Sequence, residues 1–165
     1  MLKKIACLSV LLSAVAHAQT IIPEEIAAPN GQQQTLLLHA KGTQIYQCVS
    51  NQGATAWQWQ RPEAQLLDEQ GNLVGTHGAG PEWTHQDGSR VTGKLLKKVD
   101  VEPDTAVAWL LLEAVAHHGN GVFANSRFIQ RVKTRGGLPP VSGCDANHLG
   151  MEKAVPYSAD YLYYQ

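Results

Sequence analysis

Long apolar runs and dense runs of positive charge are both absent from this chain, and their absence excludes several classes of protein. No segment reaches the roughly 20 uninterrupted apolar residues that a membrane-spanning helix needs. Lysine and arginine do not cluster into the basic patch of a nucleic-acid-binding protein or into a polybasic lipid-binding segment. We therefore expect no membrane span and no nucleic-acid partner.

The chain also lacks the short motifs that mark common catalytic sites. It contains no HExxH zinc motif, no GxSxG nucleophile elbow and no CxxC redox pair. Acidic residues that could form a glycosidase pair are present, but without geometry their presence is uninformative. We expect no cofactor, and the residues favour a function other than catalysis.

The first eighteen residues have the features of a secretory signal peptide. Lys3 and Lys4 form a basic n-region, residues 5–15 are apolar, and positions 16–18 carry the small-x-small pattern that signal peptidase cleaves. Cleavage leaves Gln19 as the mature N-terminus of an exported protein, periplasmic or extracellular. Without its two lysines the total of 13 Lys and Arg becomes 11 against 14 Asp and Glu, a formal net charge of −3.

Cysteine is scarce, with three residues in the whole chain, and Cys7 lies in the signal peptide. Cys48 and Cys144 remain as an even pair in an oxidising compartment, where a disulfide is the default state. The pair is separated by 96 positions (144 − 48), so the bridge would close most of the domain. Two buried thiols, or half of a metal site, are the alternatives.

Glycine and proline, by contrast, are spread along the chain and predict many turns and few long helices. The 15 Gly and 8 Pro separate short apolar or alternating segments at intervals of about 8–12 residues. This spacing predicts one mainly β domain, either an antiparallel β-sandwich or a distorted barrel, with at most one short helix. The expected strands are 35–39, 43–50, 56–60, 65–67, 72–75, 83–85, 90–99, 128–134 and 155–164.

Two further segments complete the expected organisation. Residues 105–117 permit a helix, but positions 106–112 are uninterruptedly apolar, which favours a strand buried on both faces. Residues 19–41 are expected to form an extended N-terminal lead-in that precedes the β domain at 42–165.

Several short motifs occur in a specific order between positions 42 and 164. They are GTQIYQC at 42–48, GTHGAGPEW at 75–83, DGS at 87–89, WLLL at 109–112, IQR at 129–131, TRGG at 134–137, Cys144 and YSADY at 157–161. In this order and spacing the chain resembles an uncharacterised secreted family, domain of unknown function 3455. The resemblance covers nearly all of the mature chain. It implies an exported, mostly β domain of unknown activity and supplies no mechanism.

The glycine-rich segment at 75–83 is the first candidate binding site. It contains His77 and Trp83, and His85 follows it. Glycine allows a close backbone approach, Trp83 offers a flat stacking face, and the two histidines supply polar contacts. We interpret His77, Trp83 and His85 as the rim of a site for an unidentified small molecule or glycan. The structural alternative is a tight corner with Trp83 in the core.

Trp57 and Trp59 are reserve ligand-binding residues. They lie two positions apart and therefore on one face of a strand. An exposed pair would form a stacking platform for sugar rings, whereas large aromatic side chains more often belong to the core. Arg131 and Arg135 could hold an anion, although a solvated strand face explains them more simply.

Six histidines remain after cleavage, and some of them could hold a metal. A zinc or copper site would form if His77, His85 and either His117 or His118 converged. Together with Glu82, these residues underlie an alternative function as a metal-dependent or hydrolytic extracytoplasmic enzyme. The favoured hypothesis is a monomeric, non-catalytic binding or envelope-associated module.

Overall fold

The computed structural model describes residues 20–165 and shows a mainly β fold, as expected; the predicted signal peptide at 1–18 lies outside the described residues. One 3-10 turn, η1 (Glu24–Ile26), precedes eight strands. The strands are β1 (Gln34–Asn51), β2 (Ala54–Leu67), β3 (Leu73–Gly78), β4 (Glu82–His85), β5 (Arg90–Val99), β6 (Trp109–His118), β7 (Phe128–Gly136) and β8 (Glu152–Tyr164). Within residues 20–165, no helix is long and apolar enough to cross a membrane.

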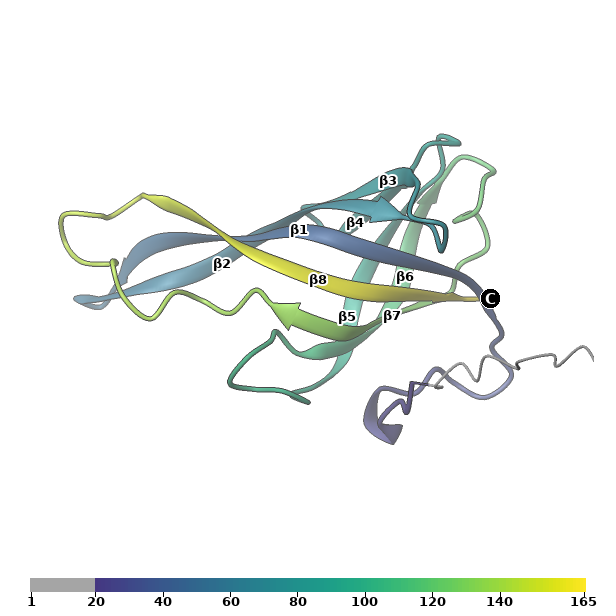
Figure 1. The fold of residues 1–165 in the computed structure, drawn as a ribbon, viewed down its shortest axis with the longest axis horizontal. Coiled ribbons are helices and arrows are strands. Elements are labelled where there is room, and N and C mark those ends of the chain that lie inside the picture. Colours follow the sequence, from purple (N-terminus) through teal and green to yellow (C-terminus); the bar gives the residue numbers. More distant parts are fainter. Residues whose placement is uncertain (1–19) are drawn as a thin grey trace, which may run out of the picture.

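The eight strands form one antiparallel sheet that closes on itself (Figure 1). Each strand pairs with its neighbours along the chain, and β1 also pairs with β8, for example Leu38 opposite Tyr161. The result is a distorted, ring-like sheet instead of two stacked sheets. Of the two architectures expected from the sequence, the closed one is therefore correct.

Some of the expected strands are parts of longer ones. The segments at 35–39 and 43–50 form the single strand β1, and those at 56–60 and 65–67 belong to β2. Gly42 lies between these first two segments. It is needed where the strands approach closely, because a Cβ atom at Gly42 would lie 2.1 Å from the carbonyl oxygen of Glu63.

The ambiguous segment at 105–117 is a strand, β6, over most of its length. Leu110 and Leu112 pack in the interior of the ring, whereas Trp109 and Leu111 pack in an apolar cluster on its outside. Both faces of the strand are therefore covered, which explains its uninterrupted apolar sequence.

Two tight turns are built around Asp and Gly residues. Gly71 and Gly88 both have φ of +85°, a conformation that glycine adopts without strain. Asp68 accepts hydrogen bonds from two backbone N–H groups of the first turn. Asp87 accepts from both the backbone N–H and the hydroxyl of Ser89 in the second turn, at 2.8 and 2.6 Å.

The N-terminal lead-in packs against the outside of the ring. Ile26 in η1 is fully buried in a cluster with Leu111, Val132 and Leu162 of strands β6, β7 and β8. The Ile26 carbonyl also accepts a hydrogen bond from the side-chain amide of Gln130, which is itself buried. The lead-in is therefore part of the packed domain, and it supplies a second apolar core outside the sheet.

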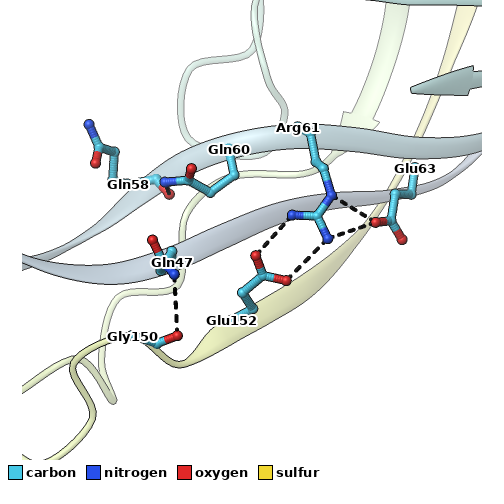
Figure 2. Close-up of polar contacts among 7 residues, drawn as sticks. All are labelled: Gln47, Gln58, Gln60, Arg61, Glu63, Gly150 and Glu152. Atoms are coloured by element: carbon cyan, nitrogen blue, oxygen red, sulfur yellow. Dashed lines mark hydrogen bonds and ion pairs between the residues drawn. The ribbon is translucent and has the colours of Figure 1, made fainter. Parts of the chain in front are cut away.

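A long hairpin made of β1 and β2 extends beyond the closed part of the sheet, together with the start of β8 (Figure 1). The predicted disulfide between Cys48 and Cys144 is confirmed, with an S–S distance of 2.03 Å. It fastens the loop between β7 and β8 to one face of the hairpin. The other face is polar: Arg61 of β2 reaches across β1 to Glu152 of β8 and also contacts Glu63, each at 2.9 Å (Figure 2).

Candidate functional site

The first candidate site, the expected rim, lies inside the ring. Trp83 of β4 is 1% exposed, and His77 of β3 is also buried. Their rings are stacked, with centroids 4.4 Å apart and planes 5° from parallel, and Nδ1 of His77 lies 2.9 Å from the carbonyl oxygen of Glu82. Burial lowers the pKa of His77 to about 4, so its imidazole is neutral at neutral pH. The structure therefore brings His77 and Trp83 together as core residues.

His85 also faces the interior but has different partners. Its ring meets Phe123 edge-on at 5.9 Å, and its Nδ1 lies 3.1 Å from a carboxylate oxygen of Asp87. Partial burial works against ionisation of Asp87, but hydrogen bonds from Ser89, the Val122 N–H and His85 outweigh it and hold the pKa of this carboxyl well below its usual range. His85 thus helps to order the turn before β5.

Three of the histidines expected as metal ligands have other partners, and the fourth, His118, is exposed. Nε2 of His117 lies 2.7 Å from the carbonyl oxygen of Ser126, and His77 and His85 have the partners described above. Within the part of the chain that the structure describes, no group of three or more His, Cys, Asp or Glu side chains is placed to hold a metal ion.

The reserve residues Trp57 and Trp59 differ in their surroundings. The indole N–H of Trp57 donates to the Ser142 carbonyl at 2.9 Å, which holds the β7–β8 loop against the hairpin. Trp59 is 48% exposed, and its indole N–H donates to the side-chain carbonyl of Gln44. Trp59 is therefore about half exposed, contrary to the expectation that it belongs to the core.

A pocket of about 530 Å³ opens beside Trp59, between β2 and β5. It exists because β3 pairs only with Ala64–Leu67 of β2, and β4 pairs only with Arg90–Thr92 of β5. Beyond these short strands, β2 and β5 separate and leave access to the interior. We call this the side pocket; its lining residues are Gln44, Tyr46, Trp59, Pro81, Leu95, Lys98, Val107, Ala108, Leu110, Leu112, Arg131 and Leu138.

The side pocket has apolar walls and a buried polar group. The apolar lining includes leucine side chains from β5 and β6 and the exposed indole of Trp59. Gln44 is 1% exposed, and while its Oε1 accepts the Trp59 N–H, its Nε2 has no hydrogen-bond partner among the described residues. A buried amide N–H without a partner is costly, so a ligand acceptor at this position would be stabilising.

The charge of the side pocket is positive. Arg131 and Lys98 line it, and no Asp or Glu does so among residues 20–165. Arg131 is partly buried and donates through Nε and Nη2 to the Ala108 carbonyl, at 3.1 and 2.8 Å. The simpler reading of Arg131, as a residue on a solvated strand face, is therefore wrong.

A further hollow, of about 660 Å³, lies between β1, β7 and β8. Its carboxylate, Asp160, is already 2.6 Å from Nδ1 of His39 and 3.4 Å from Nζ of Lys133. The other charged groups that line it, Lys41 and Arg135, are exposed, and solvent screens exposed charges strongly. We assign no function to this hollow.

Gln44 and Tyr46 are side-pocket residues that the sequence did not single out. In segment 43–50 both sets of alternating positions carry apolar residues, so the alternation could not show which face points inward. Tyr46 donates its hydroxyl to the Gly137 carbonyl at 2.6 Å and so holds the loop that follows β7 beside the pocket. The only available signal was a glutamine within an otherwise β-prone segment.

Comparison with known proteins identifies the family. The family described as "Protein of unknown function (DUF3455)" matches residues 29–165, a span that contains all eight strands and every residue of the side pocket. No curated protein and no solved structure shows a significant match to the chain. The chain therefore belongs to the DUF3455 family of proteins of unknown function.

Proposed function

We propose that this protein is a non-catalytic binding module that holds one small molecule in the side pocket. The observation that most directly supports this proposal is that one apolar pocket combines an exposed Trp59 with a buried, unpartnered Gln44 amide. Pockets of roughly 300–1,000 Å³ with apolar walls and a few placed polar groups are typical of small-molecule sites. The side pocket, at about 530 Å³, falls in this range.

The chemistry of the lining residues supports binding over catalysis. Among the described residues that line the side pocket there is no His, Asp, Glu or Cys. These residue types supply most general acids, general bases and nucleophiles. The side pocket is better equipped to hold a ligand by stacking and hydrogen bonding, either an apolar ring system or a sugar ring against Trp59.

The disulfide supports a place of action outside the cytoplasm. Cys48–Cys144 joins the hairpin to the loop that carries Leu138 of the side pocket. Disulfides persist in the periplasm and outside the cell and are rare in reducing compartments. We therefore propose that the module binds its ligand after export.

Binding of a neutral aromatic probe tests this proposal. N-phenyl-1-naphthylamine becomes fluorescent in apolar sites, and we expect it to bind the mature wild-type protein. Trp59→Ala should weaken binding about tenfold or more, because burial of an aromatic face contributes roughly 1.5–3 kcal/mol. Leu73→Ala, which removes an exposed apolar side chain outside the side pocket, is the control. Failure of the wild type to bind, or equal losses in both variants, would contradict the proposal.

A further inference from the structure

We infer that the ligand of the side pocket is an amphipathic anion, a molecule with an apolar body and one acidic head group. This inference rests on the proposed function and adds the chemical class of the ligand. It depends on three observations: an arginine without a counter-ion, donors without matching acceptors, and an exposed apolar entrance.

The first observation is that Arg131 has no counter-ion among the described residues. Its guanidinium is partly buried against the interior of the ring, and it makes no ion pair with a carboxylate in residues 20–165. The backbone carbonyl of Ala108 holds it in place but does not neutralise its charge. A partly desolvated cation without a counter-ion is costly, so an anion beside Arg131 would be stabilised.

The second observation is the excess of donors over acceptors in the side pocket. Gln44 offers an unpartnered amide N–H, and Lys98 on β5 adds a second positive charge, which is exposed and therefore partly screened by solvent. The Trp59 N–H and the Tyr46 hydroxyl already donate to protein oxygens. With no carboxylate in the lining, a cationic ligand would meet repulsion, whereas an anionic oxygen would find two cations and an amide.

The positive side pocket also differs from the protein as a whole. Residues 19–165 carry a formal net charge of −3, from 11 Lys and Arg against 14 Asp and Glu. A positive pocket on an acidic chain is a local arrangement and not a consequence of overall composition. It discriminates among small ligands by the sign of their charge.

The third observation is the apolar entrance. Trp59 and Leu95 are both large and exposed, they come from the two strands that separate at the opening, and both line the side pocket. Leu110 and Leu112 continue the apolar surface inward. The head group would therefore sit near Arg131, with the apolar body lying between Trp59 and Leu95.

A matched pair of probes tests the inference. 8-Anilino-1-naphthalenesulfonate and N-phenyl-1-naphthylamine share one ring skeleton and differ in the anionic sulfonate. We expect the mature protein to bind the sulfonate at least about tenfold more tightly, and to lose part of this preference as salt is raised. Lys98→Gln and Arg131→Gln should each reduce the preference. Lys94→Gln, on the same strand but outside the side pocket, should leave it unchanged.

The possible outcomes separate the two proposals. Equal, Trp59-dependent binding of both probes overturns the anion inference and leaves the proposed function intact. Binding of neither probe overturns both. A preference for the sulfonate that Lys98→Gln and Arg131→Gln do not alter overturns the assignment of these residues. Because Arg131→Gln also removes hydrogen bonds to Ala108, the charge reversal Lys98→Glu at an exposed position provides a test that does not depend on folding of the arginine variant.

Discussion

Gly93 of β5 lies directly against the indole of Trp83: a Cβ atom at Gly93 would be 2.9 Å from Cζ3 of the indole. The same atom would be 3.2 Å from a methyl group of Leu112. The absence of a side chain at Gly93 therefore makes room for the largest buried side chain of the ring. Trp83 in turn stacks on His77, so the three residues form one packed unit.

Gly93→Ala is expected to destabilise the protein by about 1–3 kcal/mol, because overpacking forces a rigid indole or the backbone to move. Urea unfolding followed by circular dichroism measures the change. Gly78→Ala is the control, since a Cβ atom at Gly78 meets no atom within 4 Å. Equal stability of Gly93→Ala and the wild type would show that Trp83 is not packed as described.

His77 should make the protein less stable as the pH falls from about 6.5 to about 4. Burial, with a smaller contribution from the charge of Arg131, lowers the pKa of His77 in the folded state to about 4 from its ordinary value of 6.5, despite the hydrogen bond to Glu82. Between these values the unfolded chain binds a proton that the folded chain does not. Stability is therefore lost at about 1 kcal/mol per pH unit over this window.

The control for this pH dependence is His77→Phe, which keeps an aromatic ring beside Trp83 and Tyr161 but cannot titrate. The free energy of unfolding should fall less steeply in this variant than in the wild type between pH 6 and pH 4.5. Equal slopes would mean that the His77 imidazole is accessible to protons in the folded state.

Ile26→Ala is expected to cost about 2–5 kcal/mol, the usual range for removing a buried aliphatic side chain. Ile26 is a fully buried member of the apolar cluster on the outside of the ring, even though it lies in the lead-in before the first strand. Ile21→Ala provides the comparison, because Ile21 in the same segment is 89% exposed. If both variants unfold at the same denaturant concentration, the lead-in does not pack on the sheet in solution.

Removal of the disulfide by the double substitution Cys48→Ala and Cys144→Ala is expected to destabilise the protein by about 2–5 kcal/mol. It should also weaken probe binding, because the bridge and the Tyr46–Gly137 hydrogen bond fasten the loop that carries Leu138. Thermal unfolding and probe titration check both effects. Unchanged binding in a folded double variant would show that the loop needs no covalent tether to complete the pocket.

The local structure could largely be predicted from the sequence, because strands and turns depend on neighbouring residues. The expected strand at 90–99, which has the same bounds in the structure, is an example. The choice between a closed barrel and a sandwich could not be made from the sequence, since closure depends on the pairing of β1 with β8, whose partners Leu38 and Tyr161 are 123 positions apart (161 − 38). No local pattern specifies a pairing of that kind.

The candidate site shows more clearly that long-range strand pairing cannot be predicted from local sequence. Trp59 and Trp83 are both tryptophans in strands, and the sequence made Trp83 the first candidate for a binding rim and Trp59 a reserve residue. The structure reverses this, because the short strands β3 and β4 leave Trp59 at an opening while Trp83 fills the interior. Arg131 faces inward for a comparable reason. Which face of a strand points inward depends on register, and register is set by partners far away in the chain.

The most direct test of the side pocket is a two-dimensional NMR titration of the mature protein with 8-anilino-1-naphthalenesulfonate, following the indole N–H signals of Trp57, Trp59, Trp83 and Trp109. We predict that the Trp59 signal shifts progressively with probe concentration and that the Trp83 signal stays in place. Shifts of Trp83 without Trp59, or no saturable shift of any indole, would contradict the account and return attention to the residues around His77.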